Sequence, residues 1–134
     1  MISGLSHLTL ITRDLAKMSR IIVDVLGGEE IYDSDAKNFS ISHEKFFMVG
    51  NLWIVAMEGE SLPSRTYNHI AFKTDEAGLE RAQSAIENLG LEIKASRPRV
   101  EGEGHSLYFY DHDNHLFELH TGTLDERLAH YGKG

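Results

Sequence analysis

The feature that most constrains this chain is one short pattern that occurs in both of its halves. Residues 6–14 read SHLTLITRD, and residues 68–76 read NHIAFKTDE. Each copy places a polar residue and a histidine at the start of an alternating run typical of a strand, and ends in an acidic residue that can begin a helix. A repeat separated by roughly half the chain predicts two similar modules.

The segments that follow each copy repeat the same order of elements. In the first half, the pattern predicts a helix and three strands at 15–26, 29–33, 38–42 and 46–57. In the second half, it predicts a helix and three strands at 76–89, 91–94, 106–110 and 115–120. Gly27 and Gly90 follow the two helices, as is usual at helix ends. Each half therefore predicts a βαβββ module, with alternating runs as strands.

These modules give an α+β fold class and a simple division of the chain. Module 1 spans about 4–58 and module 2 about 66–121. The segment 58–65 (EGESLPSR) is rich in Gly, Pro and Ser and is interpreted as the linker. Residues 122–134 are expected to form a C-terminal helix, at 124–131, and a tail.

The composition restricts the possible partners. A net charge of −8 argues against a nucleic-acid binder and against a protein that binds anionic membranes, because both need a basic surface. The absence of cysteine excludes disulfides, thiolate metal sites and a cysteine nucleophile. No apolar run approaches the roughly eighteen residues of a membrane span. We therefore expect a cytoplasmic protein whose partner is a small molecule and whose chemistry uses histidine and carboxylate.

Strand alternation brings out one candidate metal-binding set. His7 and His69 occupy equivalent positions of the two repeats, and Glu118 lies in the middle of the last strand between apolar neighbours. A buried glutamate needs a reason, since burial of an unpaired charge is costly. Two imidazoles and one carboxylate suit a divalent first-row ion and leave positions open for a substrate.

The other histidines have simpler explanations. His120 shares a strand face with Glu118 and is an alternative ligand. The remaining five are expected to be structural or surface residues, with the two that flank the DHDNH turn in solvent; they are His43, His105, His112, His115 and His130.

The motifs GLSHLTL, YNHIAF and SLYFYDHDNHLFELHTGTLDERL resemble the fosfomycin resistance enzymes of the vicinal oxygen chelate superfamily. The resemblance covers nearly the whole chain. It implies paired modules that form a cup around a metal ion, Mn(II) in this family although other divalent first-row ions are possible. It also implies a homodimer that exchanges modules, so that His7 and the pair His69 and Glu118 come from different chains.

Within that family, the segments NFSISHEKFFMVGNLW and RPRVEGEG resemble the water-using branch, FosX. The resemblance implies hydrolysis of the fosfomycin epoxide to a vicinal diol, with Glu44 as the general base. Without it, Glu44 would be interpreted as a surface turn residue. Thr9, one pleat beyond His7, is expected to donate a hydrogen bond near the oxirane oxygen.

The same resemblance suggests which residues bind the phosphonate. Ser106 and Tyr108 share a strand face, and Arg127 lies in the TLDERL segment. All three match phosphonate contacts of the family, and an anionic ligand needs such cationic and hydroxyl donors. Tyr67 and Arg97 are further candidates for the pocket wall.

Three alternatives remain open at this point. One is a glutathione or bacillithiol transferase acting on fosfomycin, which an acidic Glu44 would disfavour by repelling a thiolate. Another is a ring-cleaving Fe(II) dioxygenase, which also uses two histidines and a glutamate. The third is a metal-free drug-binding module, which would not need His7, His69 and Glu118.

Overall fold

The structure is a computed structural model that describes residues 1–35, 42–94 and 104–132. It divides into two compact units. Unit 1 holds residues 1–64 and 112–114, and unit 2 holds residues 65–111 and 115–134. Each unit is described by itself.

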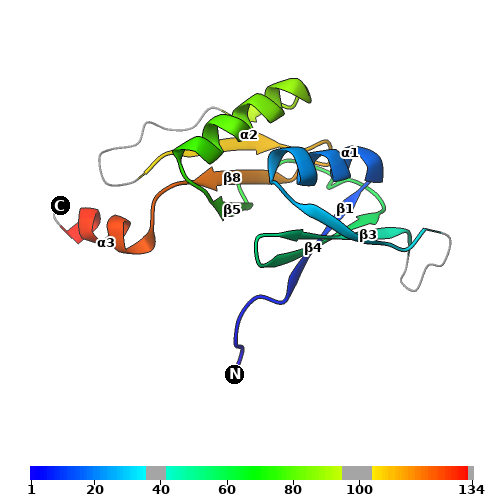
Figure 1. Ribbon diagram of the computed structural model, residues 1–134, viewed down its shortest axis with the longest axis horizontal. Helices are drawn as coiled ribbons and strands as arrows, with labels where there is room; N and C mark the ends of the chain where they lie inside the picture. The colour runs from blue at the N-terminus through cyan, green and yellow to red at the C-terminus, as the bar shows by residue number, and fades with distance from the viewer. Residues whose placement is uncertain (36–41, 95–103, 133–134) are drawn as a thin grey trace. The chain divides into compact units, whose positions relative to one another are not determined.

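Unit 1 contains a four-stranded sheet with a helix (Figure 1). Its elements are β1 (His7–Thr12), α1 (Leu15–Arg20), the π-helical turn η1 (Ile21–Val25), β2 (Glu29–Asp33), β3 (Glu44–Val49) and β4 (Leu52–Glu58). The strand order is β1-β4-β3-β2, in which β1 runs parallel to β4 and the other pairs are antiparallel.

Unit 2 repeats this arrangement (Figure 1). Its elements are β5 (His69–Lys73), α2 (Glu76–Asn88), β6 (Ile93–Lys94), β7 (Ser106–Tyr110), β8 (Leu116–His120) and the terminal helix α3 (Leu124–Gly132). The strand order is β5-β8-β7-β6, again with one parallel pair, β5 with β8. The prediction of two βαβββ modules is confirmed.

The predicted helix boundaries have local causes. Asp14 accepts a hydrogen bond from the backbone N–H of Lys17 at 3.0 Å, and Asp75 accepts one from that of Gly78 at 2.7 Å. Both aspartates satisfy N–H groups that the first helical turn leaves without a partner. Gly27 and Gly90 have φ values of 72° and 68°, which end the helices in the left-handed region.

The prediction of one strand over 46–57 is wrong. The chain turns at Gly50 and Asn51, so that β3 and β4 form an antiparallel hairpin in which Val49 pairs with Leu52. Gly50 has a φ of 58°, which suits the first position of a two-residue hairpin loop. The strand expected at 38–42 lies, apart from Ser42, outside the described residues. The module still has its three strands after the helix, because the hairpin supplies two of them.

Each sheet has one face that contributes to a hydrophobic core. In unit 1, Leu10, Phe47 and Ile54 are buried on the face against which α1 packs. In unit 2, Phe109, Phe117 and Ile86 are buried between the sheet and α2. Because side chains alternate along a strand, the residues between them project from the opposite face. That opposite face carries every strand residue predicted for the site. Among the described residues, no helix has the length and apolar character that a membrane span requires.

Candidate metal and substrate site

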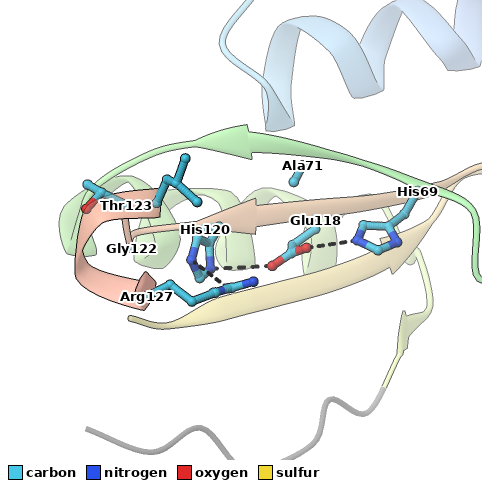
Figure 2. Close-up of a pocket in the computed structure, with 8 residues that line it drawn as sticks. His69, Ala71, Glu118, His120, Gly122, Thr123 and Arg127 are labelled. Atoms are coloured by element: carbon cyan, nitrogen blue, oxygen red, sulfur yellow. Dashed lines mark hydrogen bonds and ion pairs between the residues drawn. The ribbon is translucent and has the colours of Figure 1, made fainter. Parts of the chain in front are cut away.

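The centre of the candidate site in unit 2 is the pair of His69 and Glu118. His69 begins β5 and Glu118 lies on the adjacent strand β8, where their side chains share one face. The Nε2 atom of His69 lies 3.1 Å from Oε1 of Glu118, as Figure 2 shows. The Nδ1 atom of His69 lies 2.7 Å from the backbone carbonyl of Tyr67, so Nδ1 carries the proton that this carbonyl accepts.

This geometry fits a divalent cation. With Nδ1 as the donor, Nε2 of neutral His69 presents a lone pair to an anionic oxygen of Glu118. Two such acceptors lie close together at low cost only when a second proton or a cation stands between them. Adjacent ligands of an octahedral ion are about 3 Å apart when its bonds are about 2.1 Å long. The donor set is therefore suited to a first-row metal ion.

Glu118 is kept ionised although it is buried, with an exposed fraction of 5%. Burial raises the pKa of its carboxyl, but hydrogen bonds from Ser106 and Tyr108 help to lower it below its usual value. The hydroxyl of Ser106 donates to Oε2 of Glu118 at 2.6 Å. An ionised carboxylate is the form that binds a metal ion.

Tyr108 supports the same carboxylate from strand β7. Burial, the hydrogen bond with Tyr67 and the charge of Glu118 all raise the pKa of the Tyr108 phenol. The hydroxyl oxygens of Tyr67 and Tyr108 are 3.3 Å apart. Tyr108 therefore stays neutral and can donate a hydrogen bond. Tyr67 itself is exposed, at 61%.

A cavity of about 340 Å³ opens beside the pair (Figure 2). It is lined by His69, Ala71, Glu118, His120, Gly122, Thr123, Leu124 and Arg127. Arg127 projects from α3 toward His120, and its NH2 group lies 3.3 Å from the Nε2 atom of that ring. The cavity thus joins a carboxylate and imidazoles to a guanidinium, which suits a ligand that carries an anionic group.

Unit 1 carries the predicted residues His7, Thr9 and Glu44 on the sheet face opposite α1. His7 and Thr9 are exposed on β1, and the ring of His7 packs against that of Trp53 with centroids 4.3 Å apart. The strand register from β1 through β4 to β3 puts Glu44 on the same face. Glu44 begins β3 and has an exposed fraction of only 8%, so it is not the surface turn residue that the sequence would suggest without the family resemblance.

Ser34 holds the backbone of Glu44 in place. Its hydroxyl accepts a hydrogen bond from the N–H of Glu44 at 2.9 Å, and its own N–H donates to the carbonyl of Glu44 at 3.0 Å. Ser34 is buried, with an exposed fraction of 1%. Two backbone contacts to one buried residue fix where β3 begins, and with it the position of the Glu44 side chain.

The structure brings together His69, Glu118, Ser106, Tyr108 and Arg127 in unit 2, and places His7, Thr9 and Glu44 on one sheet face of unit 1. Arg97 lies outside the described residues, as does most of the RPRVEGEG loop. The two-residue spacing from Glu118 placed His120 on the same strand face, as an alternative ligand. Its contacts with Ser106 and Arg127 were not predicted, because these two residues come from elements distant in sequence.

The remaining histidines are in structural or surface positions, with one correction. His115 is not solvated, because its Nδ1 atom lies 2.6 Å from Oδ2 of Asp111 and its side chain is only 13% exposed. His112 is exposed as predicted. His43 lies at the surface beside Asp33, and His105 lies beside Glu76. His130 is half-buried near the ring of Tyr131.

Comparison with known proteins shows which family the chain belongs to. The family model of the glyoxalase/bleomycin resistance protein/dioxygenase superfamily matches residues 4–119. The chain is 57% identical to the fosfomycin resistance protein FosX of Mesorhizobium japonicum, over 100% of this chain and 96% of that protein. It is 56% identical to FosX of Listeria monocytogenes, over 98% of each. The metallothiol transferase FosB of Staphylococcus saprophyticus is 31% identical, over 98% of this chain and 85% of that protein.

Solved structures give the same picture. A glutamate-to-glutamine mutant of Listeria monocytogenes FosX, complexed with Mn(II) and 1S,2S-dihydroxypropylphosphonic acid, superposes with a TM-score of 0.87. It is 53% identical, and the match covers 98% of this chain and 99% of that one. FosX from Mesorhizobium loti gives a TM-score of 0.85 at 53% identity, covering 96% of this chain and 99% of that one.

Proposed function

The chain belongs to the glyoxalase/bleomycin resistance protein/dioxygenase superfamily and, within it, to the FosX fosfomycin resistance proteins, and we propose that it inactivates fosfomycin by Mn(II)-dependent hydrolysis of its epoxide. The observation that carries this proposal is the set of side chains around Glu118, which matches the chemistry of the metal and phosphonate bound by the relative. The dihydroxypropylphosphonic acid in that relative is the product expected when water adds across the epoxide.

His7, His69 and Glu118 are the residues that would hold the metal ion. When bound, Mn(II) supplies Lewis acidity that stabilises the negative charge developing on the oxirane oxygen. The carbonyl of Tyr67 orients the His69 ring, and Ser106 orients the Glu118 carboxylate. Both ligands are thus fixed by partners outside the metal site.

Glu44 is the proposed general base. Its carboxylate would take a proton from the water that attacks the carbon next to phosphorus, while the carbon–oxygen bond of the oxirane breaks. The oxirane oxygen would keep the bonding electrons and take a proton from solvent, which gives the diol, and Glu44 would release to solvent the proton that it took from the attacking water. Thr9, on the same sheet face as Glu44, would donate a hydrogen bond near that oxygen.

The phosphonate is proposed to bind in the cavity next to Arg127. The guanidinium can donate two hydrogen bonds to one anionic group. Ser106 and Tyr108 remain proposed contacts, although in this structure both hydroxyls serve the Glu118 carboxylate, so a phosphonate contact would require them to change partner. Tyr67 and Arg97 remain proposed members of the pocket wall.

A homodimer with exchanged modules and a cytoplasmic location are part of the same proposal. The family resemblance supports the dimer, since it divides the three metal ligands between two chains. Light scattering on a size-exclusion column tests the dimer. Cell fractionation followed by immunodetection tests the location.

Phosphorus NMR tests the reaction directly. The protein is incubated with Mn(II) and fosfomycin, with and without glutathione or bacillithiol, beside the variants Glu44→Gln and Glu60→Gln. We expect the diol without any thiol, a loss of about 10²- to 10⁴-fold in Glu44→Gln, and no change in Glu60→Gln, whose carboxylate is exposed. A thiol adduct as the main product would instead assign the chain to thiol transfer, the activity named for its FosB relatives.

A further inference from the structure

His120 connects two groups of the site that the sequence analysis treated separately, the Glu118 carboxylate and the Arg127 guanidinium. It follows Glu118 by two residues on β8, so both side chains project from one face of the sheet. Across the strand pair, His120 lies opposite Ser106 on β7. On its other side it meets Arg127, which reaches it from α3 (Figure 2).

The direction of each hydrogen bond follows from the chemistry of its partners. Arg127 can only donate, so the Nε2 atom of His120, 3.3 Å from the Arg127 NH2 group, must accept. A neutral imidazole that accepts at Nε2 carries its proton on Nδ1. Nδ1 lies 2.7 Å from the hydroxyl oxygen of Ser106, which therefore accepts.

The Ser106 hydroxyl then has its own proton to give, and it donates to Oε2 of Glu118 at 2.6 Å. The sequence of donors thus runs from Arg127 through His120 and Ser106 to the carboxylate. The Oε2 atom of Glu118 faces this network and is 3.4 Å from Nδ1 of His120. Its Oε1 atom lies 3.1 Å from Nε2 of His69. One oxygen of Glu118 is held by the protein, and the other points toward the second metal ligand.

We propose that His120 is a positioning residue with two roles. Through its Nδ1 atom and Ser106 it aligns the Glu118 carboxylate, and through its Nε2 atom it aligns the Arg127 guanidinium. The assignment of these two sides to metal and phosphonate rests on the proposed function. The alignment itself rests on the hydrogen bonds within unit 2. His120 is not a metal ligand in this arrangement, because both ring nitrogens are engaged by other protein groups.

Substitutions can remove the hydrogen bond at Nδ1 and the one at Nε2 separately. An asparagine amide N–H can replace Nδ1–H of the imidazole, so His120→Asn keeps the donor to Ser106 and loses the acceptor for Arg127. A glutamine side chain reaches farther, so its carbonyl can replace Nε2, and His120→Gln keeps the acceptor for Arg127 and loses the donor. His112→Asn and His112→Gln, at an exposed turn residue, are the matched controls.

Two measurements test the effects of the Nδ1 and Nε2 contacts separately. Electron paramagnetic resonance of free Mn(II) gives the metal dissociation constant without substrate, and steady-state kinetics at saturating Mn(II) give KM and kcat. We expect His120→Gln to weaken Mn(II) binding about 10- to 100-fold, as loss of a group that orients a ligand does. For His120→Asn we expect Mn(II) affinity within about threefold of the parent and a KM raised about tenfold, from the lost charge-assisted hydrogen bond.

A double substitution checks that the metal effect passes through Ser106. On a Ser106→Ala background, His120→Gln should weaken Mn(II) binding no further, because residues acting through one network are not additive. Equal effects of Asn and Gln on both measurements, or additive losses with Ser106→Ala, would overturn the proposal. If the parent protein binds Mn(II) but does not turn over fosfomycin, the proposed function fails. The Mn(II) constants and the fosfomycin dissociation constant then still decide the role of His120.

Discussion

The two modules have the same sheet topology and the same register, but they use equivalent positions differently. His7 and His69 correspond, and the strand pairings make Val55 the counterpart of Glu118. In the same way Met57 corresponds to His120. On the neighbouring strands, Phe46 corresponds to Tyr108, and Glu44 corresponds to Ser106.

This difference separates two ways of placing a carboxylate. In module 2, Glu118 is surrounded by groups that donate hydrogen bonds to its oxygens, which hold it ionised and fix its direction. In module 1, the corresponding positions around Glu44 are apolar, and Ser34 anchors only its backbone. The first arrangement suits a metal ligand, whose geometry must be fixed. Among the described residues, the second leaves the Glu44 carboxylate oxygens available to a substrate water.

The largest effect should come from removing the charge of Glu118. We expect Glu118→Gln to weaken Mn(II) binding by more than about 100-fold and to abolish measurable fosfomycin hydrolysis. An amide is a weaker ligand than a carboxylate, and it does not compensate the positive charge of the ion. Isothermal titration with Mn(II) measures this. Glu80→Gln, an exposed residue on α2, controls for loss of charge. A Glu118→Gln protein with parental Mn(II) affinity would contradict the assignment of ligands.

A smaller effect should follow when Tyr108 is made to resemble its counterpart. Tyr108→Phe removes a hydrogen bond to Glu118 and keeps the ring, so we expect Mn(II) binding about tenfold weaker. Phe46→Tyr makes the reverse change at the corresponding position of module 1, and should leave Mn(II) affinity unchanged. The same titration measures both variants. Equal effects of the two substitutions would show that the modules do not differ in this way.

Removing the anchor of Glu44 tests the other half of the comparison. Ser34→Ala leaves the N–H of Glu44 without its buried acceptor, which should cost about 1 kcal/mol in free energy of unfolding. We also expect kcat to fall a few-fold while Mn(II) affinity is unchanged, as for a shift in base position. Urea denaturation and kinetics measure the two effects. Ser84→Ala, at an exposed helix position, is the control. A parental kcat would argue against a positional role for Ser34.

The smallest effect concerns the surface pair beside β3. A hydrogen bond with Asp33 raises the pKa of His43 above its ordinary 6.5, and the same bond lowers the pKa of Asp33 below 3.8. The stability from His43 is present below pH 6.5 and is lost as the pH rises through its raised pKa; that from Asp33 is lost as the pH falls below 3.8. Between about pH 6 and 8, we expect the melting temperature of His43→Gln to depend less on pH than that of the parent protein. Identical pH profiles would contradict the pairing.

Much of the fold could be predicted from the sequence because local physics sets it. The repeat, the alternation of apolar residues and the helix caps at Asp14 and Asp75 depend on near neighbours in the chain. The same alternation placed His7, His69 and Glu118 on strand faces. The hairpin was missed although Gly50 and Asn51 form a two-residue turn signal, because the apolar segments on both sides of that pair were interpreted as one strand.

What the sequence determined by itself is therefore the pair of βαβββ modules and, through the family motifs, the chemistry to expect. What only the tertiary structure decided is which groups meet: that Ser34 anchors Glu44, and that Ser106 and Arg127 bind the two sides of His120. These contacts join residues on separate elements, so they depend on strand register and on how α3 returns to the sheet. Neither is encoded in the spacing of residues along the chain.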